Sequence, residues 1–273
     1  MTIDMAIKQA VSWLREADGL VITAGAGMGV DSGLPDFRGS EGFWQAYPAL
    51  KQAGVDFRQI ANPDAFRSKP LRAWGFYGHR LKLYRETVPH RGFAILQALS
   101  AGMPHGHFVF TSNVDGQFQK AGFSQQQIVE CHGSIHFLQC MSGCEQDVWS
   151  ADRFKPVVDE AHCALSNAMP VCPYCGVTAR PNILMFNDWN WVSQRTQFQG
   201  LRLNAWRQQL ERPVVIELGA GTAIPSVRVE GELFGAPLIR INPREAEVKD
   251  VRAVSIPLGA LAGLELIEQA WRG

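Results

Sequence analysis

The sequence predicts an α/β protein in which a parallel, doubly wound sheet carries two small additional modules. Three observations support this fold class. Apolar segments of strand length alternate with helical segments along most of the chain. Polar or glycine-rich residues follow four of the predicted strands. Two closely spaced pairs of cysteines, at positions 140 and 144 and at positions 172 and 175, indicate a separate metal-binding module.

The periodicity of apolar residues assigns the individual elements. Residues 41–90 are rich in aromatic side chains and carry prolines at positions that suit helix starts. Residues 136–180 show little continuous periodicity, so we expect metal rather than a hydrophobic core to hold this module. Helices are predicted over 4–17, within 41–90, and over 91–100, 196–210 and 257–271. Strands are predicted over 20–23, 107–111, 127–130, 182–186, 213–218 and 237–242.

The composition indicates a globular chain with no bulk charge to attract a polyanion. Hydrophobic residues make up 46% of the 273 residues, and 26 Lys and Arg balance 26 Asp and Glu. A neutral chain has no overall attraction for nucleic acid or for an anionic membrane. We therefore expect no direct nucleic-acid partner and no membrane partner.

The first 20 residues predict an amphipathic helix rather than a secretory signal. Asp4 comes early, a basic leading region is missing, and apolar residues recur at helical spacing. No apolar run reaches the length of about 18 residues that a transmembrane helix needs. We therefore expect a cytoplasmic protein whose cysteines are thiols or metal ligands rather than disulfides.

Four candidate ligand-binding segments begin where predicted strands end. They are GAGMG after 20–23, SNVD after 107–111, CHG after 127–130 and GAGT after 214–218. Parallel sheets bind ligands beyond the carboxyl ends of their strands. The N–H groups of Gly25, Ala26 and Gly27 are candidates for binding a diphosphate at a helix N-terminus, where glycine allows close approach. A tight turn between strand and helix is the alternative.

The cysteine spacing predicts a structural zinc site. One pair is separated by three residues and the other by two, with the CPYCG sequence typical of a zinc knuckle. Four thiolates leave no open position for a substrate. Four unrelated buried thiols are the alternative. We expect the zinc ligands to be Cys140, Cys144, Cys172 and Cys175. Cys131 and Cys163 are left over, and we expect Cys131 to be a core residue.

Together these motifs resemble those of the sirtuins, the NAD-dependent protein deacylases. The likeness runs in order from about residue 6 to 265 and includes GAGMGVDSGLPDFRG, TSNVDGQFQKAG, CHGS, the zinc cysteines, RPNILMFND, GAGT and Ile241-Asn242. Departures such as Ala24, Gly29 and Ser112 suggest a divergent member of bacterial type. The resemblance implies a discontinuous Rossmann-like NAD-binding domain over 1–40, 85–135 and 200–273. It also implies a helical small module over 41–84, and a zinc-binding module with a substrate-cleft segment over 136–199.

The resemblance also implies the site residues. His132 would be the general base, a task that suits a side chain whose pKa lies near neutrality, and Asn113 and Asp115 would act beside it. NAD would be a consumed co-substrate. Its binding residues would be Gly25, Ala26, Gly27, Asp36, Phe37, Arg38, Ser112, Asn113, His132, Gly219, Gly221 and Asn242.

The acyl side departs most from the family pattern. The family's FGE, which pairs with the substrate peptide as an added strand, is FND in this chain, and Leu184 replaces a smaller residue. The implied substrate-binding residues are Leu184, Phe186 and Asn187, and the implied partner is an acylated lysine of a protein. Two alternatives remain open. The first is a protein ADP-ribosyltransferase or an NAD hydrolase on the same scaffold, and the transferase would use an ADP-ribose acceptor protein as its partner. The second is a catalytically silent NAD- or ADP-ribose-binding module.

Overall fold

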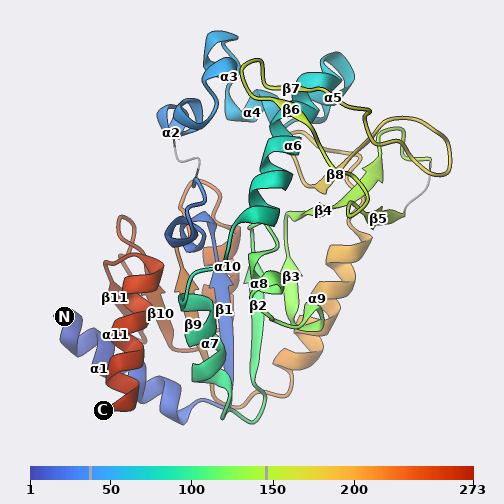
Figure 1. Ribbon diagram of the computed structural model, residues 1–273. Coiled ribbons are helices and arrows are strands. Elements are labelled where there is room, and N and C mark those ends of the chain that lie inside the picture. The colour runs from blue at the N-terminus through green and yellow to red at the C-terminus, as the bar shows by residue number, and fades with distance from the viewer. Residues whose placement is uncertain (37–38, 145–146) are drawn as a thin grey trace.

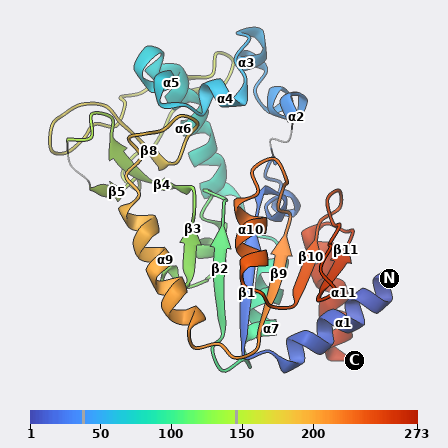
Figure 2. The same cartoon turned by 180° about the vertical axis from the view of Figure 1, so that it is seen from behind.

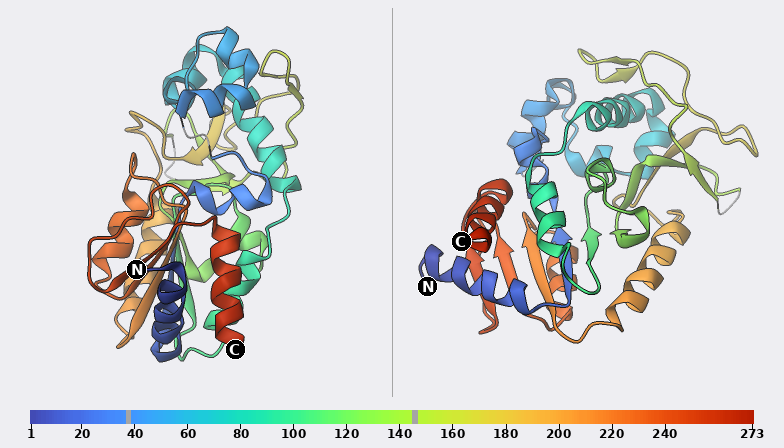
Figure 3. Two further views of the ribbon diagram at one scale, coloured as in Figure 1. Left: turned by 90° about the vertical axis from the view of Figure 1, so that its left-hand side faces the viewer. Right: turned by 60° about the horizontal axis from the view of Figure 1, so that its bottom comes forward.

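The computed structural model describes residues 1–36, 39–144 and 147–273, so the predicted ligands Phe37 and Arg38 lie outside the described residues. A six-stranded sheet forms the lower part of the molecule in Figure 1, and a second part of helices and short strands lies above the carboxyl ends of the strands. The side view in Figure 3 shows the same arrangement. Among the described residues, none of the helices has the length and apolar character needed to cross a membrane.

The main sheet is parallel throughout, with strand order β11-β10-β9-β1-β2-β3. Its central strand is buried at every position, as a parallel sheet covered on both faces requires. The predicted strands of this sheet are confirmed, and β11, a four-residue strand behind a charged segment, was not predicted. The strands are β1 (Gly19–Ala24), β2 (His107–Thr111), β3 (Ile128–Glu130), β9 (Pro213–Leu218), β10 (Leu238–Ile241) and β11 (Ala253–Ile256).

Helices cover both faces of the sheet, as the doubly wound prediction requires. On one face lie α1 (Ile3–Glu16), α7 (Gly92–Ser100) and α11 (Ala260–Arg272), which share one hydrophobic core with the strands. On the other face, seen from the front in Figure 2, lie α9 (Gln194–Arg207) and α10 (Ser226–Leu233). The sequence did not predict α10, which is short and contains a glycine. Short elements among the loops are α8 (Gln117–Lys120) and the 3-10 turns Ala26–Met28, Val30–Ser32 and Gln125–Gln127.

Among the described residues, the second part combines five helices with two small antiparallel sheets. Its sheets have the orders β5-β4-β8 and β6-β7. The helices are α2 (Gly39–Ala46), α3 (Pro48–Gln52), α4 (Phe57–Ile60), α5 (Pro63–Ser68) and α6 (Pro70–Glu86). The strands are β4 (Gly133–Cys140), β5 (Val148–Ser150), β6 (Val158–Asp159), β7 (Ala164–Leu165) and β8 (Ala179–Ile183).

The strand predicted over 182–186 is displaced. The structure places β8 at Ala179–Ile183 and pairs it with β4. Beyond it, Leu184 N–H donates to the His132 carbonyl and Phe186 N–H donates to the Ala61 carbonyl, both at 2.9 Å. The first bond continues the pairing with the residue before β4, and the second connects the chain to the residue that follows α4 (Phe57–Ile60).

The helical and cysteine-containing segments share one hydrophobic core. Trp74 of α6 is fully buried and donates its indole N–H to the Ala179 carbonyl at 3.0 Å. Leu138 and Cys163 pack in the same cluster as the aromatic side chains of α6. The expectation that metal rather than a core holds the cysteine module is therefore wrong for the part of the module that packs on α6. There the side chains of α6 complete a hydrophobic core that the cysteine module could not form alone.

Candidate active site

A cavity of about 910 Å³ lies between the strand ends of the main sheet and the second part. Four segments from the sheet line it, and they are the four predicted from the strand ends. They are Gly25–Ala26 after β1, Ser112–Asp115 after β2, His132 after β3 and Ala220–Thr222 after β9. The parallel topology brings these segments, up to about 200 positions apart in the sequence, to one edge of the sheet.

The two glycine loops at this edge pack backbone against backbone. A Cβ at Gly27 would lie 2.7 Å from Gly219 Cα, and a Cβ at Gly25 would lie 2.8 Å from Ala220 Cα. Gly219 also has a φ of 57°, in the left-handed region that favours glycine. The close contact that requires these glycines is therefore between the loops themselves.

This packing corrects the predicted set of phosphate donors. Gly25 N–H donates to the Leu218 carbonyl at 2.9 Å and Gly27 N–H donates to the Gly219 carbonyl at 3.1 Å. The helix that begins at this point is a three-residue 3-10 turn, Ala26–Met28, with Gly25 as its N-cap. The N–H groups of Gly25 and Gly27 are therefore used in hydrogen bonds to the chain after β9 and are not free to bind a phosphate.

Other residues that line the cavity have backbone N–H groups without a protein acceptor. Within the described part of the chain, the N–H groups of Ala26, Gly221 and Thr222 donate to no protein acceptor, and all three residues line the cavity. Clustered backbone N–H groups of this kind form anion-binding concavities. Two loops rather than one therefore supply the candidate anion site.

Asn242 holds the second glycine loop in shape. Its side chain is buried, donates to the Ala220 carbonyl at 2.9 Å and accepts from the N–H groups of Arg244 and Glu245 at 3.0 Å. Arg228 also donates to the Ala220 carbonyl. The side chain of Asn242 is thus occupied by protein partners.

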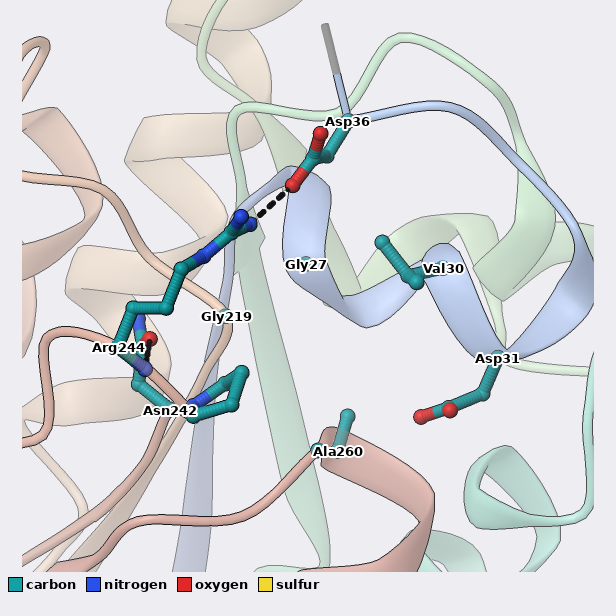
Figure 4. A pocket seen from close by; sticks show the side chains of 10 residues that line it. Gly27, Val30, Asp31, Asp36, Gly219, Asn242, Arg244 and Ala260 are labelled. Carbon is teal, nitrogen blue, oxygen red and sulfur yellow. Dashed lines mark hydrogen bonds and ion pairs between the residues drawn. The ribbon is translucent and has the colours of Figure 1, made fainter. Parts of the chain in front are cut away.

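A smaller cavity of about 70 Å³ adjoins the first (Figure 4). Asp36 lines both cavities and forms an ion pair with Arg244, drawn as a dashed line in Figure 4. The predicted residues Gly27, Gly219 and Asn242 line this smaller cavity. The Asp36–Arg244 pair therefore stands at the boundary of the two spaces.

The backbone on both sides holds His132 at the end of β3. Its carbonyl accepts from Leu184 N–H at 2.9 Å, and the N–H of the preceding Cys131 donates to the Thr111 carbonyl at 2.9 Å. Burial lowers the pKa of His132 below its ordinary value of 6.5, and a hydrogen bond with the Ser112 backbone acts in the opposite direction. The imidazole is therefore neutral at pH 7 and able to accept a proton.

Asn113 and Asp115 line the cavity from the loop after β2. Asn113 donates its side-chain amide N–H to the Gly25 carbonyl at 2.9 Å, which fixes the orientation of the amide. Asp115 is buried and accepts from Gln117 N–H at 2.9 Å. Desolvation raises the pKa of Asp115 to about 6, although the hydrogen bond from Gln117 opposes the shift.

One face of α6 contributes three lining residues that the sequence analysis did not single out. They are Tyr77, Arg80 and Tyr84, whose spacing of three and four positions places them on one side of a helix. Arg80 is buried and donates to the Tyr84 hydroxyl through Nε at 2.9 Å and Nη2 at 2.7 Å. The wall opposite the sheet therefore carries a buried positive charge. Helical spacing was the signal that could have identified these residues.

The predicted acyl-side segment forms another part of the wall. Leu184 and Phe186 line the cavity, whereas Asn187 is not among the lining residues. Asn187 adopts a φ of 55°, a left-handed conformation that asparagine tolerates better than most residues. The next residue, Asp188, forms an ion pair with Arg180 at 2.7 Å, with both side chains almost completely buried. A left-handed residue and a buried ion pair therefore hold this turn.

Comparison with known proteins decides the family. The Sir2 family model matches residues 25–200, which is more than half of the chain. The chain belongs to the Sir2 family. It is 30% identical over 247 residues to NAD-dependent protein deacylase 2 of Pyrobaculum aerophilum, covering 86% of this chain and 84% of that protein. It is 26% identical over 267 residues to the NAD-dependent protein deacylase of Thermus thermophilus, covering 96% and 93%.

The fold agrees with solved structures of the Sir2 family. A structure described as a Sir2 homolog–NAD complex matches with a TM-score of 0.73 and 22% sequence identity, covering 97% of this chain and 94% of that chain. At this identity the likeness concerns the fold. The predicted α/β architecture with its parallel sheet and cysteine module is confirmed.

The four predicted zinc ligands of this Sir2 family member converge at the far end of β4. Their sulfur atoms all lie within 4.8 Å of one another, with separations of 3.5 to 3.6 Å between neighbours. Tetrahedral zinc with Zn–S bonds of about 2.3 Å requires S–S separations of about 3.8 Å. The thiol set Cys140, Cys144, Cys172 and Cys175 is positioned to bind zinc, and all four are free of disulfides.

Proposed function

We propose that this chain is an NAD-dependent protein-lysine deacylase. In the proposed reaction the amide oxygen of an acyl-lysine attacks the anomeric carbon of the nicotinamide ribose, and nicotinamide leaves. With one water molecule consumed, the bond between the acyl group and the lysine nitrogen breaks, the acyl group is transferred to a hydroxyl of ADP-ribose and the lysine amine is released. The observation that carries the proposal is the single cavity that joins His132, Asn113 and Asp115 to the segment at Leu184 and Phe186.

NAD would lie along the two glycine loops. The N–H groups of Ala26, Gly221 and Thr222 suit the diphosphate, because they are backbone donors without a protein acceptor on described residues that line the cavity. The smaller cavity beside Asn242 extends the same edge of the sheet, so the dinucleotide would pass Asp36 where the two spaces meet. The nicotinamide end would then face the residues after β2 and β3.

His132 would take the proton from a ribose hydroxyl. Its depressed pKa keeps it neutral near pH 7, which is the form that a general base requires. Asn113 would contact the nicotinamide ribose, in the orientation set by its bond to the Gly25 carbonyl. Asp115, with a pKa of about 6, would be mostly ionised at pH 7 and would stabilise positive charge that develops on the sugar.

The acyl-lysine would enter beside Leu184 and Phe186, with the backbone of 186–188 pairing with the substrate peptide. The left-handed Asn187 supports this assignment, because it preserves a turn at the position where the family has glycine. The four thiols would hold one zinc ion that stabilises the distal end of β4 and β8. Metal analysis of freshly purified protein should find zinc in about equimolar amount, and a metal-free, folded protein would contradict this role.

Nicotinamide release tests the proposal. The protein is incubated with NAD and a library of acyl-lysine peptides of different chain length and charge, and a matched library of unmodified lysine peptides serves as the control. A deacylase releases nicotinamide only with the acylated library. Equal release without acyl peptide would instead identify an NAD hydrolase, and label transferred from NAD to protein would identify an ADP-ribosyltransferase.

A further inference from the structure

His136 of β4 is not among the residues that line the cavity, but it contacts the loop that carries Asp115. Its Nε2 lies 2.9 Å from the Asp115 carbonyl oxygen. A carbonyl oxygen only accepts hydrogen bonds, so the ring carries its hydrogen on Nε2 and donates it to this carbonyl. A side chain of the second part is therefore bonded directly to the backbone of a proposed site residue.

An irregularity in β4 places this histidine against the loop. Two adjacent residues of β8 pair with Ser134 and Leu138 of β4, which are four positions apart. Residues 135–137 are therefore extra in β4, and His136 is the middle one. Bulges of this kind are frequent next to active sites, where they redirect a side chain.

Backbone hydrogen bonds hold the bulge in place. Ile135 N–H donates to the Val114 carbonyl at 3.0 Å, which ties the bulge to the loop after β2. The His136 carbonyl accepts from Ala151 N–H at 2.8 Å, and its N–H donates to Ser134 Oγ at 3.4 Å. Both backbone groups of His136 are thus occupied, so its ring starts from a fixed point.

The ring also fills the space beside Gly116. This glycine has a φ of 72°, and a Cβ there would lie 2.7 Å from both Cδ2 and Nε2 of His136. Directly after this turn, Gln117 N–H donates to the Asp115 carboxylate at 2.9 Å. The donor that orients the carboxylate therefore follows a turn on which the imidazole packs.

The imidazole is a neutral donor. Burial lowers the pKa of His136 below its ordinary value of 6.5, and the bond to the Asp115 carbonyl opposes this shift. Among the charged groups around the ring, Arg85 lowers the pKa, whereas Glu130 and Asp152 raise it. A neutral ring places no charge beside the Asp115 carboxylate, so its effect on that group is one of geometry.

We propose that His136 is a positioning residue that holds the Asp115 backbone and thereby sets the direction of the Asp115 carboxylate in the cavity. This inference rests on the proposed function, in which that carboxylate stabilises charge that develops on the sugar. Because such an interaction is made mainly in the transition state, losing the bond should lower kcat and leave the KM values for NAD and peptide unchanged.

The test compares substitutions that keep or remove the donor. Glutamine places an amide N–H near the position of Nε2, whereas asparagine places it nearer that of Nδ1. His136→Gln should therefore keep kcat within about threefold of the wild-type value. His136→Asn should lower kcat by about 10- to 100-fold, since misplacing a group by about 1 Å can cost 100-fold. His136→Phe keeps a ring beside Gly116 without a donor and should show the same loss.

His107→Gln is the matched control. His107 is also half-buried, begins β2 at the end opposite the cavity, and bonds through Nδ1 to Ser100 Oγ at 2.8 Å. Removing this bond should leave kcat unchanged. Thermal unfolding shows whether each variant is folded at the assay temperature.

A double-mutant cycle locates the effect at Asp115. In an Asp115→Asn background, His136→Asn should change kcat by less than about threefold, because the carboxylate that it positions is already lost. A purely structural role of His136 would lower kcat by the same factor in both backgrounds.

Equal kcat in His136→Gln, His136→Asn and the wild type would overturn the inference, as would a raised KM for NAD with unchanged kcat. Losses that multiply in the double variant, or failure of both His136→Asn and His136→Phe to fold, would also overturn it. All of these outcomes leave the acyl-dependent nicotinamide release of the wild type intact. Absence of that release with every acyl peptide would instead refute the proposed function, and this inference with it.

Discussion

The two walls of the large cavity are held by different means. On the sheet side, the glycine loops after β1 and β9 pack backbone against backbone, so that a Cβ at Gly219 would lie 2.4 Å from Gly27 Cα. On the opposite side, buried side chains hold the wall. Arg180 pairs with Asp188, and Arg80 bonds to Tyr84. One wall therefore depends on the absence of side chains and the other on specific pairs of them.

This difference explains which kinds of substitution each wall tolerates. The glycines at the loop contacts are kept, because any Cβ would displace a neighbouring backbone. On the acyl side, Asn187 and Asp188 replace the family's glycine and glutamate. The turn survives because Asn187 tolerates its left-handed conformation and Asp188 still reaches Arg180. A wall held by side-chain pairs accepts substitutions that keep the pair.

Replacing the proposed base should have the largest effect on activity. His132→Ala should lower the rate of acyl-dependent nicotinamide release by about 10²- to 10⁴-fold, the usual contribution of a general base. The matched control is His162→Ala, an exposed residue that pairs with Asp159 and is not among the residues that line the cavity. Full activity in His132→Ala would refute the assignment of the base.

Breaking the buried ion pair should have the largest effect on stability. Arg180→Met leaves the Asp188 carboxylate buried without its partner, so we expect a loss of about 3–5 kcal/mol in the free energy of unfolding. Arg67→Met breaks an exposed pair with Asp64 and should cost less than about 1 kcal/mol. Urea denaturation measures both. Similar losses in the two variants would show that the acyl-side wall does not depend on this pair.

Asp115 should oppose stability while supporting activity. Its pKa is about 6 in the folded chain and 3.8 for an ordinary aspartate. The folded state therefore binds more protons than the unfolded state between these values, and stability falls as the pH rises through this window. Asp115→Asn should gain up to about 3 kcal/mol at pH 7, flatten the pH dependence of stability and slow nicotinamide release. Thermal unfolding of the wild type and of Asp115→Asn at pH 4 and pH 7 measures this effect. An equal pH dependence of stability in the two proteins would contradict the raised pKa of Asp115.

A Cβ in the glycine loops should have a smaller effect on stability. Gly219→Ala combines a left-handed φ with a backbone clash, so we expect a loss of about 1–3 kcal/mol together with weaker NAD binding. Gly102→Ala meets no atom within 4 Å and should change stability by less than about 0.5 kcal/mol. Calorimetric titration with NAD compares the two. Unchanged NAD affinity in Gly219→Ala would separate this loop from the cofactor site.

The sequence predicted the features that depend on local patterns. The alternation of strand and helix patterns predicted the parallel sheet. The motifs at the strand ends predicted that His132, Asn113 and Asp115 lie together at one edge of it, where the structure places them. The features that depend on long-range packing were missed. The role of Gly27 depends on Gly219, almost 200 positions away, and β4 takes its core from α6. A pattern within one segment carries no information about the segment that will pack on it.

The proposed reaction is tested most directly by its product balance. The wild-type protein is incubated with NAD and one preferred acyl peptide, and nicotinamide, deacylated peptide and acylated ADP-ribose are quantified by mass spectrometry. The proposed reaction predicts that the three products form in equal amounts and that His132→Ala suppresses all three together. Nicotinamide and ADP-ribose formed without deacylated peptide would contradict it.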